Sequence, residues 1–189
     1  MNHRYLQKFQ IKDVVFLAIM SAVALATCAV MPLVISLQPL IFGISQLVTA
    51  LQIGVFFAIG LYKVRKPGSL LIMALMMGLI QLMMSPPMFL SSVLNGILIE
   101  LIVLLLFRGY EKDAAVFCAA MLHTPLSLPF NYLYNRLIKG ADSPLAAVAD
   151  RAPLAAVGMT LAVVAVSALG ALIGIKITRE LKKSGVLKK

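Results

Sequence analysis

The sequence predicts an all-α membrane protein, a compact bundle of six transmembrane helices with both termini in the cytoplasm. Hydrophobic residues make up 61% of the 189 residues and charged residues only 13%, whereas charged residues are roughly 25% of an average soluble domain. Apolar runs of about 20 residues recur between short charged segments, and each is long enough to cross a bilayer as a helix. Residues 1–189 are therefore expected to form a single transmembrane domain.

Six spans are expected along the chain, between a basic N-terminal segment (1–12) and a basic tail (177–189). The second span is the longest, and its length allows it to tilt or bend. A five-span or seven-span arrangement is the alternative. The predicted spans are 14–36, 39–62, 69–85, 88–108, 114–136 and 154–176.

The lysines and arginines predict the orientation, because short cytoplasmic loops retain Lys and Arg. Basic clusters precede span one and follow spans two, four and six, whereas the connections near MPLVISLQP and MSPPM carry no charge. Both termini are therefore expected in the cytoplasm, and the net charge of +10 is explained by positive-inside anchoring in the lipid bilayer rather than by nucleic-acid binding. The clusters are Arg4, Lys8 and Lys12; Lys63, Arg65 and Lys66; Arg108 and Lys112; and Lys176, Arg179, Lys182, Lys183, Lys188 and Lys189.

Span one carries a stripe of alanines. Ala18, Ala22 and Ala26 recur every four residues, so they share one face of a helix. Small residues at this spacing let a second helix approach closely. The stripe predicts either a docking face for another protein or ordinary packing inside the bundle.

Span five carries a polar face. His123, Ser127, Asn131 and Tyr134 lie close to one side of a helix. Pro125 and Pro129 each remove a backbone donor, which predicts a kink that widens the bundle. Because polar groups within a span usually face a cavity or a partner, we expect this face to bind a ligand. The cluster continues to the outer interface with Tyr132, Asn135 and Arg136.

Span four contains Glu100, which helical rise places at about the depth of His123. An isolated carboxylate is costly inside a membrane, so a contact between Glu100 and His123 is expected to satisfy both. Amides nearby can add hydrogen bonds to a ligand or between helices: Asn95 in span four, Gln81 in span three and Gln38 at the first outer turn.

The segment 139–153 is the sizeable outer loop. Ser143 and Pro144 can begin a short helix there, so the loop is expected to be either a lid or a plain connector. The sequence has no Walker A motif, no HExxH helix, no GxSxG elbow and no cysteine cluster. We therefore predict that the chain is not an enzyme, holds no cofactor or metal, and cannot hydrolyse ATP itself.

The chain resembles the S components of energy-coupling factor (ECF) transporters, the substrate-binding membrane subunits of these ABC transporters for vitamin uptake. The resemblance lies in the size, the six spans, the basic start leading into LAIMSAVALA and the alanine stripe. It implies location in the bacterial plasma membrane, and partnership with a transmembrane coupling protein and two cytoplasmic ATPases that use ATP. The resemblance further implies that Ala18, Ala22 and Ala26 form the docking face for the coupling protein. It also implies that a micronutrient is bound near the outer surface.

The segment VRKPG (64–68) resembles the inner loop of S components associated with thiamine or its pyrimidine precursor. Three alternatives lie outside the S components. One is a stand-alone secondary transporter or channel with Glu100 and His123 as a proton relay, and another is a membrane enzyme using the same two residues as acid and base. The third is a purely structural membrane subunit.

Overall fold

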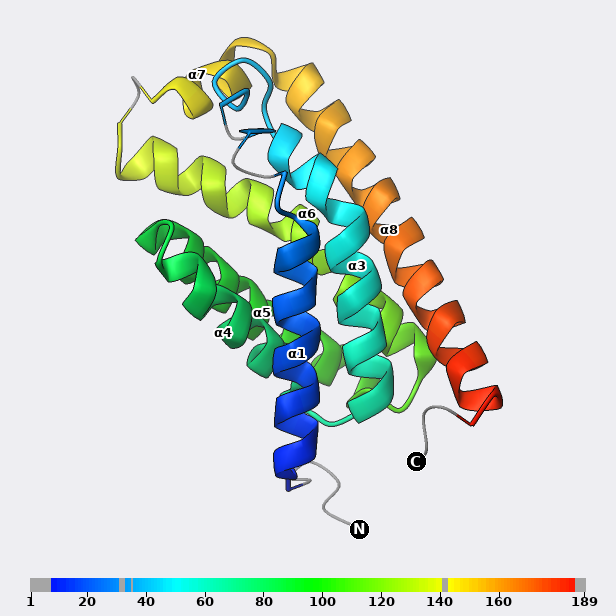
Figure 1. The fold of residues 1–189 in the computed structure, drawn as a ribbon. Helices are drawn as coiled ribbons and strands as arrows, with labels where there is room; N and C mark the ends of the chain where they lie inside the picture. Colours follow the sequence, from blue (N-terminus) through cyan, green and yellow to red (C-terminus); the bar gives the residue numbers. More distant parts are fainter. Residues whose placement is uncertain (1–7, 31–32, 35, 141–142, 186–189) are drawn as a thin grey trace.

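The structure, a computed structural model, describes residues 8–30, 33–34, 36–140 and 143–185. Within these residues seven α-helices form a bundle, without strands (Figure 1). The eight-residue α7 lies at the end of the bundle opposite to where α1 begins and α8 ends. The helices are α1 Ile11–Thr27, α3 Ile44–Val64, α4 Ser69–Leu82, α5 Pro86–Phe107, α6 Asp113–Leu137, α7 Pro144–Arg151 and α8 Pro153–Lys183.

Helix α3 is central in the bundle: it packs most extensively against α8 and also contacts α6, α1 and α4. Gly170 and Gly174 of α8 lie so close to α3 that a Cβ atom at either position would collide with the carbonyl oxygen of Leu51 or Val55. Small residues four apart allow such close backbone approach between membrane helices. Packing of α8 on α3 therefore depends on these two glycines.

The larger hydrophobic core uses the C-terminal half of α3 and the N-terminal half of α6. It includes the fully buried side chains of Leu17, Phe57, Leu61, Met73 and Val116. A smaller cluster of Ala50, Leu128 and Val163 lies nearer the other ends of α3 and α6. Because apolar packing is concentrated in one half of the bundle, the other half has room for a polar cavity.

The first connection differs from the prediction. Helix α1 ends at Thr27 instead of residue 36, and α3 begins at Ile44 instead of residue 39. Gly43 has φ = 77°, a left-handed conformation that stops a helix from continuing. Residues 37–43 form turns and a bend instead, and this places Gln38 beside the start of α3.

By length and hydropathy, three helices in the described part of the chain are candidates to span a membrane: α3, α5 and α8. The apolar α4 has 14 residues and α1 has 17, and α6 carries the polar face predicted from the sequence. Helix α8 extends to Lys183, so the first part of the basic tail continues the helix rather than forming a separate segment.

Helix α6 runs through Pro125 and Pro129 as one element. A proline at position 125 leaves the carbonyl of Met121 without its usual helical donor. Ser167 of α8 supplies the replacement, because its hydroxyl donates to the Met121 oxygen at 2.7 Å. The contact between α6 and α8 therefore satisfies a backbone group that the proline frees, as polar side chains do in membrane helices.

Candidate functional site

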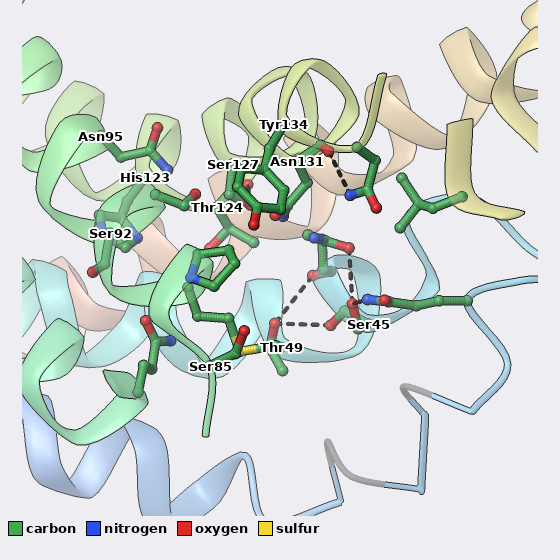
Figure 2. Close-up of a pocket in the computed structure, with 18 of the residues that line it drawn as sticks. Ser45, Thr49, Ser85, Ser92, Asn95, His123, Thr124, Ser127, Asn131 and Tyr134 are labelled. Atoms are coloured by element: carbon green, nitrogen blue, oxygen red, sulfur yellow. Dashed lines mark hydrogen bonds between the residues drawn. The ribbon is translucent and has the colours of Figure 1, made fainter. Parts of the chain in front are cut away.

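A cavity of about 600 Å³ lies at the end of the bundle where α3 begins and α6 ends. Its walls come from α3, α4, α5 and α6, with the turn at Gln38 and the start of α7 at the rim (Figure 2). Cavities of ~300–1,000 Å³ are typical of small-molecule sites. Of the eleven residues predicted to bind substrate, eight line this cavity: Gln38, Gln81, Asn95, His123, Ser127, Asn131, Tyr134 and Asn135.

The α6 wall carries polar groups from the interior of the bundle to the rim. Thr124, Ser127, Asn131 and Tyr134 follow one another every three or four residues, so they share one face of the helix. The Asn135 amide donates to the Asn131 carbonyl at 2.8 Å, and its oxygen accepts from Ser143 at 3.0 Å. This face therefore reaches into the cavity and also holds the start of α7.

The α3 wall was not predicted from the sequence. Ser45 donates to the Gln46 side chain at 2.9 Å and accepts from the Gln38 amide, and Thr49 donates to the Ser45 carbonyl at 2.9 Å (Figure 2). The sequence feature that could have indicated this wall is the group of polar residues at the start of a long apolar span, Ser45, Gln46 and Thr49. Their hydrogen bonds fix the Gln38 turn against α3.

The third wall comes from the end of α4 and the beginning of α5. Met77 and Met88 provide flexible apolar surface. Ser92, which also lines the cavity, donates to the Ala74 carbonyl at 2.9 Å and so joins α5 to α4. Figure 2 shows Ser92, Asn95 and His123 together on one side of the cavity, away from Ser45.

The deep part of the cavity contains polar atoms without a hydrogen-bond partner. They are Oδ1 of Asn95, both ring nitrogens of His123 and Oγ1 of Thr124. Asn95 is 1% exposed, and His123 and Thr124 are each 3% exposed. Leaving buried polar groups unpaired is costly and uncommon in native proteins. A polar ligand in the cavity would satisfy these atoms.

Charge is scarce around the cavity. Lys139 is the one charged residue among the described residues that line it, and it lies at the exposed rim. Across the described residues, no three His, Cys, Asp or Glu side chains are grouped closely enough to hold a metal ion. The walls therefore offer neutral hydrogen-bonding groups and apolar surface to whatever enters the cavity.

A family model for hypothetical bacterial integral membrane proteins, Trep_Strep, matches residues 11–183. The chain belongs to this Trep_Strep family. The prediction of a multi-pass membrane protein is confirmed at this level, because the family consists of bacterial integral membrane proteins. No curated protein matches the chain.

The fold of this Trep_Strep protein is similar to a crystal structure described as an S-component of ECF transporter. The two chains superpose with a TM-score of 0.64 and are 21% identical, and the match covers 95% of this chain and 89% of the other. The resemblance to S components that the sequence predicts is therefore confirmed for the fold.

Glu100 and His123 do not pair in the Trep_Strep structure, contrary to the sequence prediction. Glu100 accepts hydrogen bonds from the Gly68 backbone N–H at 2.6 Å and from the Tyr110 hydroxyl at 2.9 Å. The His123 ring packs on Phe57 instead, with centroids 4.4 Å apart. Both partners of Glu100 lie in or beside connections at the opposite end of the bundle, so Glu100 does not line the cavity and the proton-relay geometry is absent.

Tyr132 and Arg136 also lie outside the cavity lining. The Tyr132 hydroxyl donates to Asp150 at 2.7 Å, and Arg136 forms an ion pair with the same carboxylate at 3.3 Å. Asp150 lies at the end of α7, whose first residues, Pro144 and Leu145, line the cavity. These two predicted ligand residues therefore hold α7 across the rim instead of facing the cavity.

The alanine stripe lies beside the buried face of α1, and Ala22 and Ala26 border an apolar groove between α1 and the end of α4. Ala22 and Ala26 are exposed and Ala18 is half-buried, whereas Leu17, Ser21 and Ala24 are buried against the bundle. The Ser21 hydroxyl donates to the Met73 carbonyl of α4 at 3.2 Å, which fixes the rotation of α1. Among the described residues, Ala22 and Ala26 thus leave surface open to the approach of another helix.

The VRKPG segment forms a structural junction at the end opposite to the cavity. Arg65 and Arg179 both bond to the Asp113 carboxylate, and Lys66 donates to Asp13 at 2.7 Å. Burial opposes ionisation of Asp113, but the hydrogen bonds from Arg179 and Arg65 outweigh it, so the pKa of this carboxyl lies below its usual 3.8. None of the VRKPG residues lines the cavity.

Proposed function

We propose that this Trep_Strep protein is the substrate-binding S component of an ECF transporter. It captures a vitamin or related micronutrient at the outer face and delivers it inward when docked on the coupling protein and its two ATPases. The observation that carries this proposal is the ~600 Å³ polar cavity at one end of an S-component fold, because a fold with an open polar cavity and no catalytic grouping among its lining residues suits binding rather than chemistry.

The proposed orientation has six membrane spans and both termini in the cytoplasm. The support is the distribution of charge: Arg65, Lys66 and Arg179 lie together with Asp13 and Asp113 at the end opposite to the cavity. Positive residues favour the cytoplasmic side. In this orientation the cavity opens to the outside, where a scavenged nutrient would arrive.

The proposed contacts to substrate are the polar residues along the α6 wall, with Gln38, Gln81 and Asn95 from the other walls. Asn131 and Tyr134 lie toward the rim end of the α6 face, where an aromatic ring and an amide can stack on and hydrogen-bond to a flat heterocycle. The resemblance of VRKPG suggests a ligand like thiamine or its pyrimidine precursor. Since that segment is remote from the cavity, the choice of ligand depends on the cavity walls.

The proposed docking face is the stripe Ala18, Ala22 and Ala26. Its support is exposure combined with small size, because a partner helix can approach a surface of alanines closely. The test is co-expression with a tagged coupling protein and the two ATPases from the same bacterium. We expect the wild-type chain to co-purify stoichiometrically and Ala22→Leu to be lost from the complex.

The control for this test is Ala165→Leu, the same substitution at an exposed alanine of α8. It should leave the complex intact, because α8 lies outside the proposed docking face. If Ala22→Leu and Ala165→Leu both co-purify like the wild type, the alanine stripe is not the docking face. If the wild-type chain itself fails to join the complex, the S-component proposal is wrong.

A further inference from the structure

The buried polar atoms that lack partners are concentrated in one place. Within the described residues they belong to five side chains, and three of these, Asn95, His123 and Thr124, line the deep part of the cavity. Gln52 and Ser69 do not line it. A general shortage of hydrogen bonds would scatter such atoms through the bundle, so the concentration points to a ligand that completes them.

The other polar side chains of the walls are largely used by the protein itself. Ser92 donates to the Ala74 carbonyl, Ser127 to Thr124 and Thr49 to Ser45. These bonds leave the deep group as the part of the cavity whose buried polar atoms still lack a partner. Along α6, His123 of the deep group precedes Tyr134 by eleven residues, which is ~16 Å at 1.5 Å per residue.

The deep group has a definite chemistry. An asparagine oxygen accepts, a hydroxyl donates and accepts, and a neutral imidazole offers one donor and one acceptor. Among the described residues, no charged side chain lines this part of the cavity, where Ile53 and Met77 complete the wall. The carboxylate of Glu100 is already bonded to Gly68 and Tyr110, so a cation here would remain unpaired in a low-dielectric site, at a large cost.

We infer that the ligand inserts an uncharged planar heterocycle, carrying both hydrogen-bond donors and acceptors, between Asn95, His123 and Thr124. This inference rests on the proposed function and names the substrate class of the same cavity. The rim differs from the deep end, because Lys139 is exposed there. Anionic substituents of the ligand therefore remain at the rim beside Lys139, whereas a cationic ring is disfavoured at the deep end by the lack of a counter-charge and at the rim by repulsion from Lys139.

The test uses matched neutral and cationic probes and isothermal titration calorimetry of the detergent-purified full chain. One pair is the hydroxymethyl aminopyrimidine and thiamine, which carries a closely related aminopyrimidine joined to a cationic thiazolium ring. The second pair is nicotinamide and its N-methylpyridinium analogue, and riboflavin is a further neutral probe. We expect at least one neutral probe to bind, and every cationic probe to bind at least about ten-fold more weakly.

Two substitutions locate the binding at the deep group. Asn95→Leu and Thr124→Val remove the unpartnered oxygens, and each should weaken binding of the best neutral probe about ten-fold or more. Neither should lower the unfolding midpoint of the ligand-free protein, because an unpaired buried polar atom is removed. The controls are Gln52→Leu and Ser69→Ala, which remove unpartnered atoms outside the cavity and should leave binding unchanged.

The outcomes separate this inference from the proposed function. Tighter binding of thiamine or the methylpyridinium than of any neutral probe overturns the inference but leaves an S component that binds a cation. The inference is likewise overturned, and the S component retained, if a neutral probe binds Asn95→Leu and Thr124→Val as tightly as the wild type. If no probe binds and no small molecule co-purifies with the wild-type chain, the proposed function fails together with the inference.

Discussion

The hydroxyl of Tyr110 donates a hydrogen bond to Oε2 of Glu100 at 2.9 Å, and both side chains are buried. The other carboxylate oxygen accepts from the backbone of Gly68 at 2.6 Å. Glu100 therefore joins the α3–α4 connection to the α5–α6 connection at the end remote from the cavity. Its role in the structure is to fix these two connections relative to α5.

Tyr110→Phe removes one donor from Glu100 and should lower the free energy of unfolding by about 1–3 kcal/mol. Thermal inactivation followed by size-exclusion chromatography in detergent measures this as a lower midpoint. Glu100→Gln can still accept one hydrogen bond, so its free energy of unfolding is expected to fall by less. Ligand affinity should stay the same in both variants. A loss of ligand binding without a loss of stability would instead show that Glu100 takes part in substrate binding.

Gly170→Ala should destabilise the bundle by about 1–3 kcal/mol or more, because the new methyl group collides with the Leu51 carbonyl and separates α8 from α3. The matched control is Gly158→Ala on the same helix, where a Cβ atom meets nothing within 4 Å. The free energy of unfolding of this control variant should equal that of the wild type or exceed it by about 0.5–1 kcal/mol, because alanine has the higher helix propensity. Equal midpoints for the two variants would show that α3 and α8 do not depend on close packing at this position.

Asp113 makes stability depend on pH. Its pKa is lower in the folded protein than its usual 3.8, so the contribution is complete above about pH 4 and is lost as the pH falls through the folded pKa. Asp113→Asn should lower the unfolding midpoint at pH 7 and flatten the decline below pH 4. Parallel midpoint curves for wild type and variant between pH 7 and pH 3 would contradict this role.

Asp150 should slow the release of a ligand, because it holds the end of α7 through Tyr132 and Arg136. These exposed bonds contribute up to about 1 kcal/mol, so Asp150→Asn is expected to speed dissociation about five-fold. Stopped-flow measurement of release checks this. Glu180→Gln, which breaks a surface pair with Lys183 far from the cavity, is the control and should release ligand at the wild-type rate.

Much of the architecture could be predicted because hydrophobic length and small-residue spacing are local properties of the sequence. The polar face of α6 was found by its helical period, and it does line the cavity from His123 to Asn135. The short helix between Pro144 and Arg151 was expected from its capping residues. These signals require no knowledge of how the helices are arranged.

The remaining features depend on three-dimensional contacts that spacing does not encode. The depth estimate placed Glu100 near His123, but Glu100 instead turns toward Tyr110 and Gly68. Thr124 gives no sequence signal, because a threonine inside a helix ordinarily bonds to a backbone carbonyl of the preceding turn. The wall at Ser45 and Thr49 was not predicted, because the predicted span began at residue 39 and placed both residues inside it. In the structure α3 begins only after Gly43, whose left-handed conformation sets the start of the helix.

Native mass spectrometry of the detergent-purified chain, followed by denaturing release and identification of any bound small molecule, tests the central claim most directly. We expect one vitamin-like compound per polypeptide, lost when Asn131→Ala and Tyr134→Ala are combined. A chain that carries no compound and also ignores a panel of vitamins would contradict substrate binding. The chain would then be a structural or coupling subunit, and the polar face of α6 would serve helix packing.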